Sequence, residues 1–223
     1  MIQKIIDKCN EISLIDGLLE TLYMVLVSAI IAFILGLVLG LILTITDKNG
    51  IKPNKWINSI LGLIVNLGRS IPFIILMVFL IPFTRLIVGQ SWGETAAIIP
   101  LTIGAIPFVG RLTETHFKEV DKSIVESATC MGASTWRIAI SVYLGETIPS
   151  LIRAFSLTTI TLIGYSAMAG TIGAGGLGNI AIVWGYMRYD DLAMLISIVL
   201  IILLVQIIQL GFELIAKKID KSR

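Results

Sequence analysis

Residues 126–144 read ESATCMGASTWRIAISVYL, and they interrupt a chain whose other long segments are apolar. Ser123 and Glu126 have the S-x-x-E spacing of a capping box, which predicts a helix capped by Ser123. Gly132 is typical of a helix end, and Ser134 or Thr135 can cap a second helix beginning at Trp136. The segment is therefore predicted to form a helix, a tight turn and a second helix.

The same segment has the composition of a docking surface. Its small side chains allow a partner to approach closely, and its large apolar ones supply anchors of the kind that dominate binding energy. The alternative is a polar loop, but the connection from Val109 to Pro149 is much longer than joining two helices requires. The predicted interface residues are Glu126, Ser127, Ala128, Met131, Gly132, Ala133, Trp136 and Leu144.

Composition places the chain in a membrane. Hydrophobic residues make up 56% and charged residues 14% of the 223 positions, and the mean hydropathy is +0.94. These values are too apolar for a soluble domain. The net charge of +2 indicates no nucleic-acid partner.

The fold class is predicted to be all-α, with five membrane spans in a domain covering residues 17–215. Proline interrupts the second span at Pro72 and Pro82, and the third span is short and carries Pro100 and Pro107. Pro149 is expected in the first turn of the fourth span. An amphipathic surface helix is predicted at 1–16, the coupling segment at about 119–145 and a basic tail at 216–223. The spans are 17–46, 57–84, 94–109, 149–169 and 192–214.

With five spans, most basic residues fall on one side of the membrane. They lie in the 47–58 connection, in the long connection that holds Glu126, and at the C-terminus. The positive-inside rule then makes the Glu126 segment and the C-terminus cytoplasmic and the N-terminus external. Cys9 and Cys130 fall on opposite sides, so no disulfide is predicted.

Several short motifs are weak indicators. Gly173, Gly175 and Gly178 match G-x-G-x-x-G, but they follow a span rather than a strand, so a permissive turn or a re-entrant loop is the better interpretation. Gly36 and Gly40 form a G-x-x-x-G, for which chance and close helix packing are both open. His116 has no companions at ligand spacing, so no metal site is predicted. The predicted span cores hold no Asp or Glu, which argues against a proton or sodium relay.

A second set of residues is a candidate translocation pathway or gate. Arg69 lies within an apolar run. Its charge either has a function inside the membrane or is carried by the long side chain to the membrane–water interface, and both interpretations stay open. The polar residues of the fourth span either line a pathway or bond helix to helix. The candidates are Arg69, Ser70, Pro72, Tyr165, Ser166 and Met168.

Glu126-Ser-Ala, Gly132 and Val142-x-Leu144 resemble the EAA signature of ABC importer permeases. Ser127 replaces the usual Ala, and Gly145 stands where the family usually has Pro, which would loosen the end of the second helix. In that family the segment is a cytoplasmic coupling helix seated on an ATPase subunit. The stretches beginning at Arg69, Ile81, Gly164 and Gly173 are similar to the methionine-importer branch of these type I permeases.

The resemblance implies a homodimeric permease in the bacterial cytoplasmic (inner) membrane, and it covers about residues 17–211. The expected partners are two ATP-binding cassette subunits, which hold the ATP and Mg, an external substrate-binding protein and the lipid bilayer. No cofactor and no catalysis are expected in this chain, which lacks a P-loop. Glycine betaine, choline or another amino acid remain alternative cargoes, and a lone ion-driven carrier or channel is the alternative from another class. The stereoisomer carried and any feedback by internal substrate stay open.

Overall fold

The chain forms helices and turns throughout the part that the computed structural model describes, which is residue 8 and residues 11–220. It divides into two compact units. Unit 1 comprises residues 1–31, 71–104 and 159–210, and unit 2 comprises residues 32–70, 105–158 and 211–223. Most of the predicted surface helix at 1–16, Cys9 and the last three residues of the basic tail lie outside the described residues.

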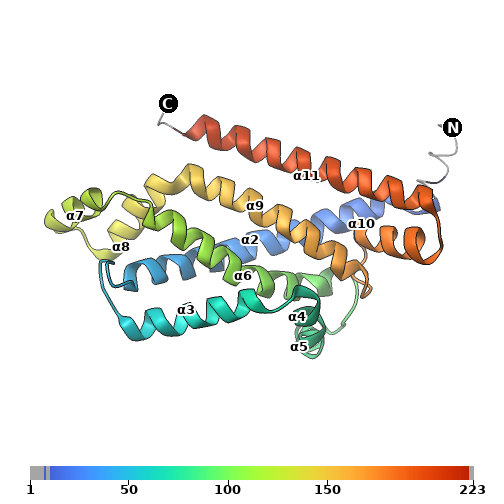
Figure 1. Cartoon of the computed structure of the whole chain (residues 1–223), viewed down its shortest axis with the longest axis horizontal. Coiled ribbons are helices and arrows are strands. Elements are labelled where there is room, and N and C mark those ends of the chain that lie inside the picture. Colours follow the sequence, from blue (N-terminus) through green and yellow to red (C-terminus); the bar gives the residue numbers. More distant parts are fainter. Residues whose placement is uncertain (1–7, 9–10, 221–223) are drawn as a thin grey trace. The chain divides into compact units, whose positions relative to one another are not determined.

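The all-α prediction is confirmed, and Figure 1 labels most of the helices. Within the described residues, four helical stretches are long and apolar enough to cross a membrane, and α3 with α4 makes a fifth if that bent pair counts as one span. The prediction of five spans corresponds to this upper count. The elements are α2 (Leu14–Thr46), α3 (Lys55–Ser70), α4 (Phe73–Phe79), α5 (Ile81–Val88), α6 (Glu94–Lys118), α7 (Lys122–Cys130), α8 (Thr135–Ile138), the π-helix η1 (Ala139–Leu144), α9 (Gly145–Gly170), α10 (Gly176–Asn179), the π-helix η2 (Ile180–Met187) and α11 (Asp191–Ile219).

The prediction of a short third span is wrong. Helix α6 has 25 residues and runs past Pro100, Pro107 and Val109 to Lys118. Its last two turns are polar, but Glu114 forms ion pairs with Arg111 and Lys118 at helical spacing. These ion pairs stabilise the helix beyond Val109, where the apolar residues alone predicted the end of the span.

The expected start of the fourth span also needs correction. Pro149 lies inside α9 rather than in a first turn, because α8, η1 and α9 run on as one 36-residue stretch from Thr135 to Gly170. Gly145 has φ −58° and ψ −47°, so the helix continues through it instead of ending there. The helix at Gly176–Met187 lies between the predicted fourth and fifth spans and was not predicted. Helix α11 extends to Ile219, past the predicted start of the tail.

In unit 2 the G-x-x-x-G of α2 is a real close contact with α6. A methyl group at Gly36 would lie 2.5 Å from Cβ of Val109. At Gly40 a methyl group would overlap Oγ1 of Thr113 and lie 2.8 Å from the carbonyl oxygen of Gly110. The Thr113 hydroxyl is also 3.3 Å from the carbonyl oxygen of Gly36. The two helices can approach this closely because Gly36 and Gly40 of α2 have no side chains.

In unit 1 the glycine-rich stretch is a turn, as predicted, only as far as Gly175, because Gly176–Asn179, which includes Gly178, is the short helix α10. Gly173, Gly175 and Gly176 have φ values of 89°, 83° and 80°, which side chains rarely adopt. The Gly176 amide donates to Oε2 of Glu20 at 2.7 Å, and the Leu177 amide donates to Oγ1 of Thr21 at 2.9 Å. Two backbone amides at the start of α10 thus hydrogen-bond to side chains of α2.

We expect Gly40→Ala to lower the unfolding free energy by about 1–3 kcal/mol, because overpacking a tight helix crossing forces the backbones apart. Gly62→Ala is the matched control, since a methyl group at Gly62 meets nothing within 4 Å. Thermal unfolding of the purified protein checks this. Equal melting temperatures for the two variants would contradict the close contact.

Candidate functional site

Helix α7 begins at a cap that the sequence analysis misassigned. Asp121, not Ser123, is the N-cap: its Oδ1 accepts the backbone amide of Ser123 at 2.9 Å. Ser123 is the second residue of the helix, so the predicted capping box with Glu126 is wrong. The hydrogen bond from the Ser123 amide lowers the pKa of Asp121, which keeps this acceptor charged at neutral pH.

The turn and second helix form as predicted. Gly132 has φ 79°, and the amide of Ala133 donates to the carbonyl of Ala128 at 3.1 Å, which closes α7 with a left-handed residue. Ser134 caps α8 by accepting the Arg137 amide at 3.3 Å. Figure 1 shows α7 and α8 side by side, joined by this short turn.

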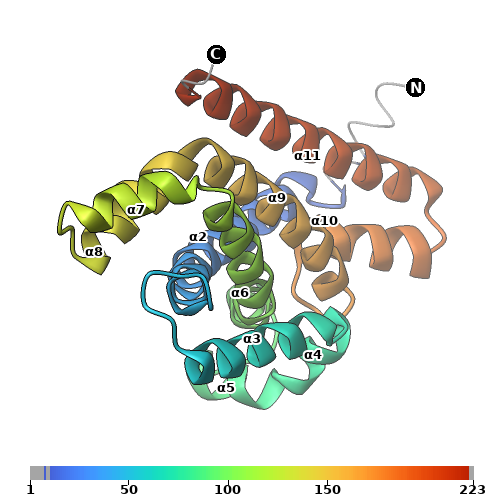
Figure 2. The same ribbon diagram turned by 60° about the vertical axis from the view of Figure 1, so that its left-hand side comes forward.

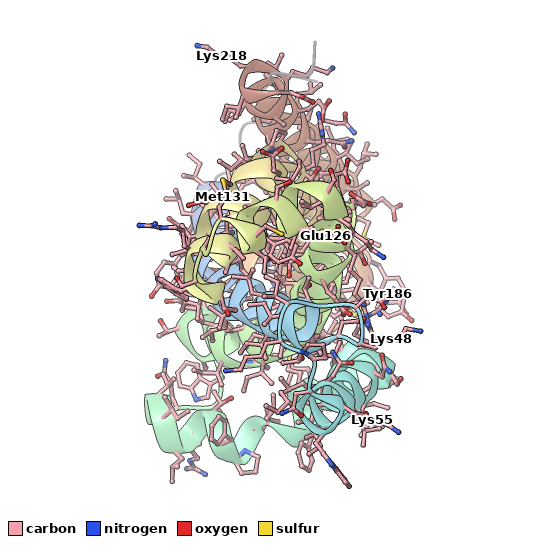
Figure 3. The ribbon with its side chains drawn as sticks, turned by 90° about the vertical axis from the view of Figure 1, so that its left-hand side faces the viewer. Lys48, Lys55, Glu126, Met131, Tyr186 and Lys218 are labelled. Carbon is pink, nitrogen blue, oxygen red and sulfur yellow. The ribbon has the colours of Figure 1, made fainter. Side chains whose placement is uncertain are left out.

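The predicted interface residues separate into two groups. Met131 and Trp136 are 81% and 72% exposed, and Glu126, Ser127 and Gly132 are exposed with them. Figure 3 faces this end of unit 2 and labels Glu126 and Met131. The exposed side of the segment therefore offers large apolar side chains for contact.

The other three predicted residues pack inward. Ala128 is buried, and Ala133 and Leu144 are half-buried against the same apolar cluster. The cluster joins α7, α8 and η1 to residues of α2, α6 and α9 that also belong to unit 2. Its buried members are Leu41, Phe117, Ala128, Ile138, Ala139, Tyr143 and Leu151. The segment is therefore fixed to the helices of unit 2 on one side and exposed on the other.

A chain of charged groups, which the sequence analysis did not find, lies beneath the segment. Glu114 is 4% exposed, and its two oxygens accept from Arg111 at 2.7 Å and from Lys118 at 2.8 Å. Lys118 also donates to Asp47 at 2.8 Å, and Arg111 donates to Asn66 at 2.8 Å. The network links α6 to the α2–α3 connection and to α3, all within unit 2.

The sequence contains a pattern that predicts this network, since Arg111, Glu114 and Lys118 are spaced at i, i+3 and i+7 along one helix face. The pattern was not recognised because the span was predicted to end at Val109. Glu114 lies beyond the predicted end of the third span, so the expectation that the predicted span cores hold no Asp or Glu is unaffected by it. The hydrogen bond from Lys118 lowers the pKa of Asp47, so this link is complete at neutral pH and is lost only as pH falls through that lowered pKa.

A groove of about 810 Å³ lies in unit 2 between α7, the end of α6 and the α2–α3 connection. Its walls are both apolar and charged, and they include Ile51, Phe117, Lys122 and Glu126. Lys48, labelled in Figure 3, lines the same groove. The groove reaches from the buried cluster, through Phe117 and Tyr143, to the exposed Glu126.

The candidate pathway residues divide between the units. Arg69 and Ser70 are exposed at the end of α3 in unit 2, where the Ser70 hydroxyl donates to the Asn66 carbonyl at 2.8 Å. In unit 1, Tyr165 stacks on Phe73 with centroids 4.3 Å apart and planes 4° apart. Ser166 is buried and bonds to the carbonyl of Ile163, and Met168 is 45% exposed. The exposed Pro72 precedes Phe73.

No metal site is present among the described residues, in which no group of three or more His, Cys, Asp or Glu side chains is placed to hold an ion. His116 lies 3.2 Å from Glu119 at the end of α6.

Comparison with known proteins shows the family of the chain. Residues 32–221 match the family described as binding-protein-dependent transport system inner membrane component. The chain belongs to this family. It is a multi-pass permease of the inner membrane, and it is not itself an ATPase.

Similar relatives come from distant bacteria. The chain is 47% identical to the "Probable D-methionine transport system permease protein MetI" of Vibrio cholerae, over 95% of this chain and 94% of that one. It is 45% identical to the "Methionine import system permease protein MetP" of Bacillus subtilis, over 99% and 100%. A solved structure of the MetNI methionine ABC transporter in inward-facing conformations has a TM-score of 0.92, with 43% identity over 93% of this chain and 96% of that chain. The recognition of an ABC importer permease similar to methionine importers is confirmed.

We expect Glu114→Gln to lower the unfolding free energy by about 1–3 kcal/mol, because Arg111 and Lys118 lose the carboxylate that both contact. Glu119→Gln is the matched control, since Glu119 follows the same helix and its side chain is 63% exposed. Thermal unfolding checks this, and a Glu114 variant as stable as the Glu119 variant would contradict the network's role.

Proposed function

We propose that this permease carries methionine into the cell, driven by ATP hydrolysis in a partner subunit. Two relatives of nearly equal length, at 47% and 45% identity, are named for methionine or D-methionine transport, and the similar solved structure is of a methionine transporter. The observation that carries the proposal is this agreement along almost the whole chain, together with an exposed helix–turn–helix of the EAA type. Which stereoisomer is carried is left to the assay.

The exposed side of Glu126–Trp136 is the proposed contact for the ATPase. Met131 and Trp136 supply anchors, and Gly132 and Ser127 leave room for a close approach. The groove behind α7 adds a concave surface of mixed charge. A force applied to this surface is passed to α2, α6 and α9 through the apolar cluster of unit 2.

The proposed assembly is a homodimer of permeases with two ATP-binding cassette subunits and an external substrate-binding protein. The name of the solved MetNI complex and the family description support the partner subunit and the binding protein. The basic residues of the 47–58 connection and of the C-terminus support a cytoplasmic position for α7 and an external N-terminus. ATP and Mg would be held by the partner.

We also propose that a second set of residues lines or gates the pathway. These residues are Arg69, Ser70, Pro72, Tyr165, Ser166 and Met168. The stacked pair of Phe73 and Tyr165 supports an ordered aromatic element in unit 1.

We expect a complex with Arg69→Ala to take up less labelled methionine than the wild-type complex, which an uptake assay measures. Wild-type uptake would remove Arg69 from the pathway.

The alternative cargo, glycine betaine or choline, has less support, since both of these relatives are named for methionine or D-methionine. A lone carrier is not supported by membership of a binding-protein-dependent family. Both oxygens of Glu114, the buried carboxylate of α6, are held in ion pairs by Arg111 and Lys118, which fits a structural role for this side chain.

The deciding experiment measures ATP hydrolysis by the permease reconstituted in lipid with its ATPase and the candidate binding protein. We expect L- or D-methionine to stimulate hydrolysis when loaded on the binding protein and glycine betaine to give only the basal rate. Stimulation by betaine alone would overturn the cargo. A permease that transports methionine without any ATPase would overturn the mechanism.

A further inference from the structure

The turn between η2 and α11 presents an unusual run of exposed side chains. Tyr186, Met187 and Tyr189 are 68%, 60% and 88% exposed, and Arg188 is exposed between them. We name residues 186–189 the aromatic turn. Figure 2 shows its place, where the orange ribbon of η2 turns back into α11. Four consecutive exposed residues of these types are more than a connection between two helices requires.

The backbone of the aromatic turn is held in a strained state. Tyr189 has φ 56°, a left-handed conformation that is uncommon for a residue with a bulky side chain. Such strain persists only where neighbouring contacts impose it, and it is concentrated at functional positions. Here the strain does not bury Tyr189, since this side chain is among the most exposed of unit 1. The conformation serves to point an aromatic ring outward.

Contacts on both sides of Tyr189 impose this conformation. The amide of Asp190 donates to the carbonyl of Gly185 at 3.1 Å, and Oδ1 of Asp190 accepts the amide of Ala193 at 3.0 Å to cap α11. Lys8 forms an ion pair with Asp190 at 2.5 Å. The guanidinium of Arg188 lies 4.0 Å from the ring centroid of Trp184. The turn is therefore ordered before any partner binds, which lowers the entropy cost of binding.

The charges around the turn keep it out of the hydrocarbon layer of the membrane. Arg188, Asp190 and Asp191 follow Met187 directly, and charged groups of both signs do not enter the hydrocarbon layer unassisted. Tyr, Met and Arg are the residues enriched at protein interfaces, and Tyr and Arg supply many of the residues that dominate binding energy. In the proposed topology this turn joins the fourth and fifth spans on the external side.

We propose that the aromatic turn, Tyr186–Tyr189, is a principal contact for the external substrate-binding protein, with Tyr189 as its anchor. This inference rests on the proposed function, because it takes the binding protein and the external position from it. To the proposed function it adds the surface of the permease on which the binding protein delivers its substrate. The partner is expected to offer an apolar pocket for the Tyr189 ring with polar groups at its rim.

The test uses the complete complex in lipid and titrates the methionine-loaded binding protein while ATP hydrolysis is measured. Tyr189→Gly removes the ring and suits the left-handed backbone, so it does not disturb the turn. Tyr186→Ala removes the second ring. We expect each variant to raise the half-maximal concentration of binding protein about tenfold or more, with the basal rate and the rate at saturation unchanged.

Tyr23→Ala is the matched control, since Tyr23 is a 45% exposed tyrosine of unit 1 that lies within the α2 span. It is expected to leave the half-maximal concentration unchanged. An unchanged half-maximal concentration for Tyr189→Gly, or a lower saturating rate in its place, would overturn the inference. A lower melting temperature in lipid with unchanged titration would identify a membrane anchor and also overturn it. If methionine-loaded binding protein does not stimulate the wild-type complex, the proposed function itself fails.

Discussion

The ion pairs of the buried Glu114 carboxylate are the interaction on which the arrangement of unit 2 around the Glu126 segment depends. An ionised acid with 4% exposure is unfavourable unless cations surround it, and Arg111 and Lys118 both contact it. Through Lys118 and Arg111 the same network reaches Asp47 and Asn66. The end of α6, the α2–α3 connection and α3 are thereby tied together directly beneath the segment proposed to meet the ATPase.

The proposed coupling needs a rigid connection between the proposed docking surface and the other helices of unit 2. The apolar cluster supplies it, because Ala128 of α7 and Tyr143 of η1 pack with Phe117 of α6 in one core. The exposed side of the segment meanwhile keeps Met131 and Trp136 free for contact. ATP binding shifts the transporter between states only through a difference in affinity, so the permease has to transmit that difference rather than create it.

The sequence predicted the class of fold and the position of the segment because both depend on local patterns. Apolar runs showed the spans, and Gly132 and Ser134 marked the turn and the second cap. The failures came where tertiary contacts outweigh local pattern: α6 continues through two prolines and a polar end, and Asp121 caps α7 in place of Ser123. The left-handed Tyr189 was also beyond prediction, since its conformation is imposed by Asp190 and its partners, one of which is the distant Lys8. Which of the proposed interface residues are exposed was not predictable one by one, because burial of Ala128 depends on the packing of α7 against other helices.

The central claim is that the exposed side of α7 and its turn receives the ATPase. The most direct measurement replaces Met131 by photoreactive p-benzoylphenylalanine in the assembled complex in lipid and identifies what it cross-links. The account predicts a product containing the ATP-binding subunit, and none from the same probe at Ile207, a 69% exposed position on α11. Cross-links from position 131 only to lipid or to another permease would contradict it.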